Sequence, residues 1–474
     1  MHKLQHLLWR TGFGPRTKSW EKWAALPEAA WWPKLKDDSI PDPVYFDVAD
    51  SAIKGLFMGI GELGKMERGD LSKEDKKEVR QMSRENLRSL NLHWLEEMTH
   101  TKSQLREKIA LFWHGHFASR NFNVLYQQQM LHVIREKALG NFGDLLRGVS
   151  KSAAMLAFLN NQQNKKQHPN ENFAREVMEL FTLGRGHYTE TDIKEAARAF
   201  TGWGFRLNGD FVFRKALHDN SSKTLLGKSG KYNGDDVLDI LLEQRQTARF
   251  IARKLYRFLV NDMIVPDDRI TWLGDRFYDS GYQIMRLLDD IVRSDWFYAP
   301  ENTGNKIKSP VELWVGIRRA VPFELDNPDT QLLLQRALGQ VLFYPPNVAG
   351  WPGGRNWIDS SSLMLRLRIP QMLPDRRDFD IRAKSDDDQQ MGQDERVGSK
   401  RRLAAEIDWQ PVLDLFSGIP EKELVAQIGA YLWTVSNSKM PVEVLRNHTD
   451  GSSREALIKT TMIQLMATPE YQLC

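Results

Sequence analysis

The sequence KIALFWHGHF, residues 108–117, sets the fold class that we expect for this chain. Its apolar residues recur at intervals of three and four, which is the spacing of one face of an α-helix. Two histidines, His114 and His116, interrupt the same run. The segment is therefore predicted to be a core helix, and its histidines raise the question of a functional site.

Helical periodicity also dominates the rest of the chain. The predicted helical segments are 73–98, 102–117, 123–140, 141–161, 170–184, 189–202, 234–260, 282–295, 308–321, 328–341, 408–435 and 453–468. Glycine near the end of several of these segments is typical of helix C-termini. The fold class predicted from this pattern is mainly α, with a large multi-helix body.

Strand signal is concentrated in one stretch, FRLNGDFVFRK, and predicts a small β-hairpin near 204–214. A three-residue loop, 208–210, would place Phe205 opposite Phe213 and Leu207 opposite Phe211, with all four side chains on one apolar face. We expect little other strand.

A change of composition divides the chain near its C-terminal end. Residues 375–402 are charged and polar, which predicts a disordered linker or an exposed insertion. The helical pattern returns in 403–474, which we expect to pack back on the body formed by 1–374.

Composition excludes several classes of protein. The chain has 474 residues, 66 basic and 62 acidic, and a formal net charge of +4, so it lacks the charge expected of a nucleic-acid-binding protein. Its only cysteine is Cys474, so an internal disulfide and a cysteine-based zinc or iron–sulfur site are excluded. No run is long and apolar enough to predict a membrane span. The N-terminus lacks a signal-peptide pattern, which predicts a cytoplasmic protein or one exported with a partner.

The two histidines are not expected to share a face. Positions i and i+2 of an α-helix lie about 200° apart, so His114 and His116 could bind one metal ion only if the helix is distorted or ends at Gly115. Otherwise one is a hydrogen-bonded core histidine. His116 lies nearer the stripe that contains Trp113, so we expect His116 to pack in the core and His114 to face a cleft.

A second candidate is the helix in PNENFAREVMELFTLG. Asn172, Glu176 and Glu179 follow one stripe of that helix, and paired carboxylates suit metal binding or acid–base work. Arg175 and Glu179 could equally form an ion pair on a solvated face. A neighbouring apolar stripe favours a position at the edge of a crevice.

A third candidate follows the hairpin, where His218 and Asp219 are adjacent and Lys223 is close by. Such a pair could supply a base with its orienting carboxylate, or two metal ligands. The alternative is a turn in which the aspartate caps the next segment.

The fourth candidate is FYPPNVAGWPGGRNWIDSSSLMLR, residues 343–366. Its first part, rich in proline and glycine, cannot be regular helix or strand, and WIDSSSLMLR resembles the capped start of a helix. Its glycines permit tight turns, and its Trp351, Trp357 and Arg355 could wall a binding pocket. The alternative is a structural plug over the core.

Taken together these segments resemble the bacterial family DUF1800. The strings that carry the resemblance are HLLWRTGFGP, FWHGHF, ALGNFGDLL, PNENFAREVMELFTLG, AFTGW, HDNSSKTLLG, PPNVAGWPGGRNW and LMATPEYQL, in family order along nearly the whole chain. The resemblance implies a largely helical protein and supplies no catalytic residues. It also implies a DUF1501-family protein, similar to sulfatases and phosphatases, as a candidate partner, because genes of the two families are often neighbours.

The function predicted from these observations is a hydrolytic or metal-assisted enzyme with a cleft lined by histidine and carboxylate side chains. A non-catalytic partner of a DUF1501 protein and a glycan-binding module are the alternatives. The expected cofactor, if there is one, is a divalent metal ion. The candidate catalytic residues are His114, Glu176, Glu179, His218 and Asp219, the candidate substrate-binding residues are Arg355, Trp351, Trp357 and Lys223, and the candidate metal ligands are His114, His116, His218 and Asp219.

Overall fold

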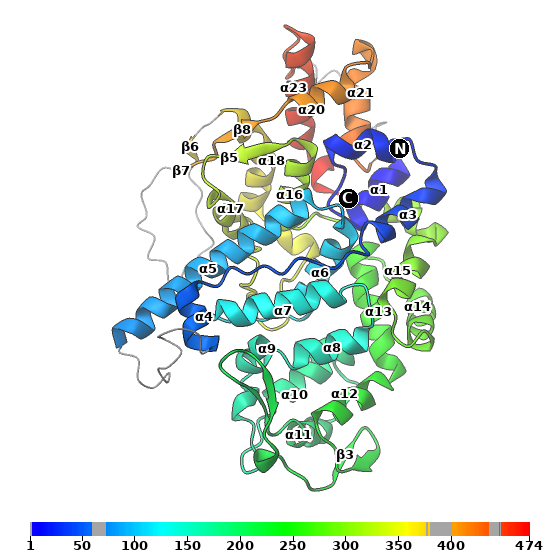
Figure 1. Cartoon of the computed structure of the whole chain (residues 1–474). Coiled ribbons are helices and arrows are strands. Elements are labelled where there is room, and N and C mark those ends of the chain that lie inside the picture. The colour runs from blue at the N-terminus through cyan, green and yellow to red at the C-terminus, as the bar shows by residue number, and fades with distance from the viewer. Residues whose placement is uncertain (1, 59–72, 376–377, 380–400, 436–444, 446) are drawn as a thin grey trace.

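The computed structural model describes residues 2–58, 73–375, 378–379, 401–435, 445 and 447–474 (Figure 1). Helices make up most of this part of the chain, which confirms the predicted mainly α class. Within it, no helix combines the length and apolar character needed to cross a bilayer.

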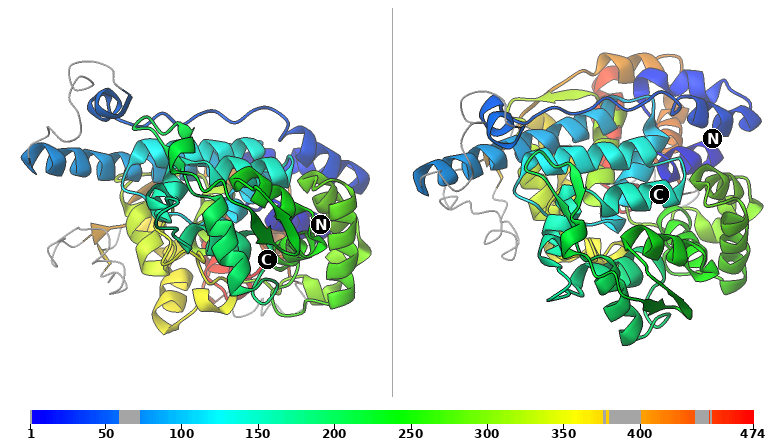
Figure 2. Two further views of the ribbon diagram at one scale, coloured as in Figure 1. Left: turned by 90° about the horizontal axis from the view of Figure 1, so that it is seen from below. Right: turned by 60° about the horizontal axis from the view of Figure 1, so that its bottom comes forward.

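The N-terminal helices lie beside the C-terminal ones, with α1 in contact with α21 (Glu421–Leu432) (Figure 1). The helices before the core are α1 (His2–Arg10), α2 (Trp20–Ala24), α3 (Glu28–Asp37), α4 (Ser51–Met58) and α5 (Lys73–His100). The N-terminal part of α5 extends away from the body in both Figures 1 and 2, while its C-terminal half packs on the core.

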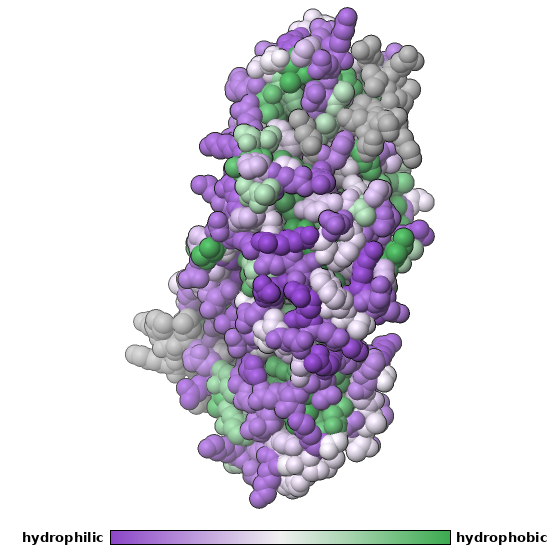
Figure 3. All heavy atoms as spheres, turned by 90° about the vertical axis from the view of Figure 1, so that its right-hand side faces the viewer, coloured by the Kyte–Doolittle hydropathy of each residue, from purple (hydrophilic) through white to green (hydrophobic). Residues whose placement is uncertain are grey.

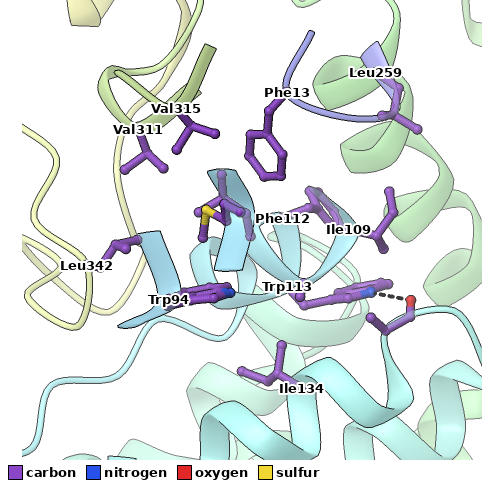
Figure 4. Packing of buried hydrophobic residues seen from close by; sticks show 14 of the residues in the cluster. Phe13, Trp94, Ile109, Phe112, Trp113, Ile134, Leu259, Val311, Val315 and Leu342 are labelled. Carbon is purple, nitrogen blue, oxygen red and sulfur yellow. Dashed lines mark hydrogen bonds between the residues drawn. The ribbon is translucent and has the colours of Figure 1, made fainter. Parts of the chain in front are cut away.

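The opening stretch forms α6 (Gln104–His116) at the centre of the molecule. Twelve of its 13 residues are buried, and Gly115 is the exception. Figure 4 shows Phe112 and Trp113 among Trp94, Ile134 and Leu342, with the Trp113 indole donating to the carbonyl of Ala138 at 3.0 Å. Helix α6 is therefore buried on all sides rather than along one stripe.

Short helices and two hairpins form the part of the chain after α6, at the lower end of Figure 1. They are α7 (Val124–Lys137), α8 (Phe142–Ser150), α9 (Ala153–Phe158), α10 (Asn172–Glu176), the π-helical η4 (Val177–Thr182), α11 (Glu190–Ala199), β1 (Trp203–Phe205), β2 (Phe211–Phe213), β3 (Lys223–Leu225) and β4 (Lys228–Gly230). The β3–β4 hairpin was not predicted from the sequence.

The predicted β1–β2 hairpin is present, but its register differs from the prediction. Phe205 pairs with Phe211 rather than with Phe213, and Trp203 pairs with Phe213. The loop is 207–209, one residue earlier than predicted, because Gly209 has φ +92°. A three-residue hairpin loop requires the left-handed conformation at its last position, and glycine adopts it without strain.

The segment 234–260, predicted as one helix, is two helices in the structure. The first, α12 (Gly234–Leu242), ends before Gln244, and the second, α13 (Arg245–Leu259), packs extensively on a helix that was not predicted, α14 (Asp267–Asp279). Next come α15 (Ile284–Val292), α16 (Pro310–Ala320), α17 (Thr330–Leu338) and α18 (Ser360–Asp375). The face that includes α14 and α15 is mainly hydrophilic, with scattered apolar residues (Figure 3).

The segment after the charged stretch packs back on the body. Strand β5 (Phe323–Leu325) pairs with β8 (Ala405–Ile407), and α23 (Arg454–Met466) contacts α18. Helices α20 (Gln410–Phe416) and α21 (Glu421–Leu432) also belong to this segment, whereas β6 (Asp378–Phe379) and β7 (Arg401–Arg402) lie within the charged stretch and pair with each other. Most of the predicted linker 375–402 lies outside the described residues.

Candidate functional site

A pocket of about 530 Å³ opens where four segments distant in sequence meet. Its walls come from the C-terminal end of α6, from α13, from residues 306–312 before and at the start of α16, and from the loop 349–357. Its volume is within the range of small-molecule sites. The C-terminal end of α6 and residues 343–357, here called the Gly/Trp loop, therefore belong to one site.

His116 is the histidine that lines this pocket. Its Nε2 lies 3.2 Å from the carbonyl oxygen of Phe181, and its Nδ1 lies 2.9 Å from Nζ of Lys254. Because a carbonyl oxygen only accepts, Nε2 carries the proton, and Nδ1 accepts from the lysine. Phe181 is in the last turn of η4, where carbonyl groups lack intrahelical donors. Burial and the Lys254 ammonium hold the pKa of His116 well below its usual value, so the imidazole is neutral.

His114 does not line the pocket and instead contacts the Gly/Trp loop at Phe343. Its Nε2 accepts from the backbone N–H of Phe343 at 3.2 Å, and its ring contacts those of Trp94, Phe343 and Trp351 at 5.0–5.5 Å between centroids. Burial lowers the pKa of His114 to about 3. The structure thus places His116 at the pocket and His114 in the packing, the reverse of the sequence expectation. A helix with one buried face would bury only one of the two histidines, whereas both are 4% exposed because α6 is buried on all sides.

Gly115, between the histidines, seats the Gly/Trp loop on the helix end. A Cβ on Gly350 would come within 2.4 Å of the Gly115 carbonyl oxygen, so the loop backbone lies directly against α6. Gly350, Gly353 and Gly354 have φ of +81°, +70° and +57°, as their predicted turns require. Phe343, where the loop begins, also has a positive φ of 69°, which is rare for a bulky residue and is held by His114.

Lys254 is a partly buried cation without an anionic neighbour in the described part of the chain. Its only hydrogen bond described in the structure is to the neutral His116, and it also lies 5.2 Å from the ring of Phe250. Among the described residues no carboxylate pairs with it. Burial, with a smaller effect of Arg257, lowers the pKa of Lys254 to about 8.

Three further cations face the pocket: Arg257, Lys306 and Arg355. Lys306 Nζ donates to the carbonyl of Arg257 at 2.8 Å and lies 3.9 Å from the Asp262 carboxylate. Burial and nearby Arg10 lower the pKa of Lys306. The pocket is therefore electropositive and suited to an anion.

Glu312 also lines the pocket, but its charge is already neutralised. It accepts from the ammonium of buried Lys108 and, at 2.7 Å, from the backbone N–H of Ser309, as part of the capping box that begins α16. Burial alone would raise the pKa of Glu312, and Lys108 outweighs it and brings the pKa to about 2.

The glutamates of the second motif lie elsewhere and do not line this pocket. Glu179 accepts from the hydroxyl of Tyr188 and from Arg185, and these two hydrogen bonds lower the pKa of Glu179. Burial and Glu179 in turn raise the pKa of Tyr188 to about 12. Burial and then Glu179 raise the pKa of Glu176. Glu179 has the local ion-pair role that was the alternative, although its partner is Arg185 rather than Arg175.

The third motif, His218 with Asp219 and Lys223, forms a closed network of its own. His218 Nδ1 lies 3.0 Å from the carbonyl of Thr201, Asp219 accepts from Arg198 at 2.8 Å, and Lys223 donates to the carbonyl of Asp219 at 2.5 Å. Burial would raise the pKa of Asp219, and hydrogen bonds from Arg198 outweigh it. These contacts hold the turn that follows β2, and none of the three residues lines the pocket.

The candidate metal ligands His114, His116, His218 and Asp219 are not brought together. Within the described residues, no three histidine, cysteine, aspartate or glutamate side chains are grouped so that they could hold a metal ion. Each of the four has the separate hydrogen-bond partners given above.

Of the candidate substrate-binding residues, Trp351, Trp357 and Arg355 line the pocket and Lys223 does not. Sequence reasoning missed Lys254, Arg257 and Lys306. The first two are three residues apart on α13, and this spacing signals a shared helix face without indicating that the face meets α6.

Comparison with known proteins identifies the chain at the level of its family. The sequence profile of DUF1800, described as a protein of unknown function, matches residues 6–473. The chain belongs to the DUF1800 family. No curated protein and no solved structure matches it. The family assignment agrees with the resemblance in eight strings and leaves the chemistry to be argued from the pocket.

Proposed function

We propose that this DUF1800 protein is an enzyme that binds an anionic small molecule in the pocket and transfers a proton through Lys254, oriented by His116. The observation that carries the proposal is the 2.9 Å hydrogen bond between Lys254 Nζ and His116 Nδ1 at the pocket wall, in a lysine without a carboxylate partner among the described residues. A ligand anion would supply the missing counter-charge.

The chemistry of Lys254 suits acid–base catalysis. Proton transfer is most efficient when the pKa of the group is near the operating pH, and the pKa of Lys254 is lowered to about 8. In hydrolysis, the reaction class expected from the sequence, the Lys254 ammonium would protonate the leaving atom and the amine would regain a proton from the attacking water. His116 accepts from Lys254 throughout and so acts as a positioning residue. A metal-assisted reaction has less support, because the candidate ligands lie apart.

The ionisation of Lys254 tests the proposal without knowledge of the substrate. Lysines labelled by reductive ¹³C-methylation can be titrated by NMR, with Lys254→Met used to assign the signal. We expect one signal to titrate near the value of about 8 and to disappear in Lys254→Met, while ordinary lysines titrate near about 10.4. An ordinary titration of Lys254 would contradict the proton-transfer role.

Activity is tested with 4-nitrophenyl phosphate and 4-nitrophenyl sulfate as anionic esters. We expect turnover that falls by about 100-fold or more in Lys254→Met, the usual range for loss of a general acid. The matched control is Lys459→Met, which removes a partly exposed lysine paired with Glu455 on α23. Equal turnover by the wild type and Lys254→Met would show that Lys254 is not catalytic.

A non-catalytic partner of a DUF1501 protein is the second candidate, and one observation favours it. Met263, at the pocket, and the adjacent Ile264 are 62% and 54% exposed, so two apolar side chains face solvent beside the pocket. The test is gel filtration of the chain mixed with a DUF1501 protein, using the wild type and a Met263→Ser, Ile264→Ser variant. Co-elution that the double substitution abolishes would support this role, and separate elution of the wild type would contradict it.

A further inference from the structure

The balance of charge in the pocket bears on the charge of the ligand. Four cationic side chains and two carboxylates face the cavity. Glu312 is neutralised from behind by Lys108, and Asp262 lies 3.9 Å from Lys306. Lys254, Arg257 and Arg355 are then left without a carboxylate partner among the described residues.

A singly charged ligand would leave most of this positive charge uncompensated in a partly desolvated space. Electrostatic complementarity favours an anion whose charge approaches that of its site. Guanidinium groups in particular bind phosphoryl oxygens with two parallel hydrogen bonds, and the pocket offers two of them, Arg257 and Arg355. A doubly ionised phosphoryl group meets both conditions.

The remaining walls are apolar and aromatic. Phe112, Phe258, Trp351, Pro352 and Trp357 line the same cavity as the cations. Aromatic walls of this kind gain from covering an apolar or ring-shaped body, which inorganic phosphate lacks.

We propose that the pocket takes a phosphate monoester, with its dianionic phosphoryl group among Lys254, Arg257 and Arg355 and a ring-shaped or apolar body against the aromatic walls. This inference rests on the proposed function, since it names the ligand class of the same pocket. The carboxylates Glu312 and Asp262 stay with their lysines and do not compete for the site.

Gly115 allows the cavity to be filled without disturbing the fold. It lines the pocket, has no positive φ, and a Cβ placed on it meets nothing within 4 Å. Gly115→Leu therefore projects a side chain into the cavity. A change of this kind separates loss of the site from loss of folding.

The experiment is calorimetric titration with phenylphosphonate, benzenesulfonate and inorganic phosphate at about pH 7.5, where a phosphoryl group is mostly doubly ionised. The first two probes share a phenyl ring and differ in charge, and phosphate keeps the charge and lacks the ring. We expect phenylphosphonate to bind at least about tenfold more tightly than either of the other two. Gly115→Leu should abolish binding of all three.

One arginine variant and a matched control test whether Arg355 recognises the phosphoryl group. Arg355→Gln should reduce the preference for phenylphosphonate over benzenesulfonate about tenfold, the effect of one lost charge-assisted pair. The control Arg253→Gln, on α13 but paired with Asp267, should keep the wild-type preference.

The outcomes separate the two proposals. Equal affinity for phenylphosphonate and benzenesulfonate would overturn the dianion inference and leave the anion pocket intact. Tight binding of inorganic phosphate would overturn the role of the aromatic walls. Failure of all three probes to bind the wild type, or undiminished binding by Gly115→Leu, would overturn the pocket itself.

Discussion

His114 gives the sharpest test of the site's architecture, through the dependence of stability on pH. Burial lowers its pKa from 6.5 to about 3 in the folded protein. Between these values the unfolded chain binds a proton that the folded chain does not, so stability falls as the pH falls through this window and is unaffected by His114 above it. At 1.36 kcal/mol per pKa unit, the loss from His114 between pH 6.5 and pH 5 is about 2 kcal/mol.

The perturbation that isolates this effect is His114→Gln. Glutamine does not titrate, and its side-chain oxygen can take the place of Nε2 as the acceptor for the Phe343 N–H. Urea unfolding of the wild type and variant at about pH 7 and about pH 5 gives two differences in the free energy of unfolding. We expect them to differ by about 2 kcal/mol in favour of the variant at the lower pH, since all other groups, including His116, cancel.

His114→Phe is the companion variant. It keeps a ring against Trp94 and Trp351 but leaves the buried Phe343 N–H without an acceptor, which costs about 1–3 kcal/mol at any pH. The reasoning is refuted if the difference between wild type and His114→Gln is the same at both pH values, because His114 would then be protonated equally in the folded and unfolded chains.

Two further predictions concern the frame of the pocket. Lys108→Met leaves the Glu312 carboxylate buried without its cation, so it should lower the free energy of unfolding in urea by about 3–5 kcal/mol. Adding Glu312→Gln should restore much of this loss. An unchanged urea midpoint in Lys108→Met would show that the pair is not buried. Gly350→Ala should lower the thermal midpoint more than Gly353→Ala does. Both glycines have a positive φ, but only a Cβ on Gly350 meets a backbone atom, the carbonyl oxygen of Gly115. Equal decreases in the midpoint would mean that the loop does not pack on α6.

Local patterns predicted many of the helices and one of the hairpins, while α14 and the β3–β4 hairpin were missed. The spacing of apolar residues indicated the segment that became α6, and glycine positions indicated where turns occur, because both signals depend on neighbours within a few residues. The hairpin was placed correctly and its register was wrong, since the register depends on which loop position Gly209 occupies. Trp351 and Arg355 were identified as pocket residues because an irregular loop with aromatic and charged side chains is typical of a binding wall.

The centre of the site could not be derived from local patterns. Lys254 is 138 residues from His116, and on an amphipathic helix a lysine is ordinarily a solvated residue. His218 and Glu179 were candidates because of their chemistry, but each is already bonded within its own segment. A sequence shows which side chains could act, whereas contacts between distant segments determine which of them remain free to do so.

In FWHGHF the two histidines are separated by one glycine, and this i,i+2 spacing suits the end of a helix that contacts two different segments. His114 and His116 point in different directions, so one can hold the loop through Phe343 while the other holds Lys254. Gly115 between them meets the backbone of Gly350 through its carbonyl group, while the place where its side chain would stand is open and borders the cavity. Three consecutive residues thereby fix the loop that carries Trp351, the open space and the lysine relative to one another. The two histidines therefore contribute to one pocket without binding the same ligand. Because they point in different directions, one helical turn contacts both the loop that carries Trp351 and the helix that carries Lys254.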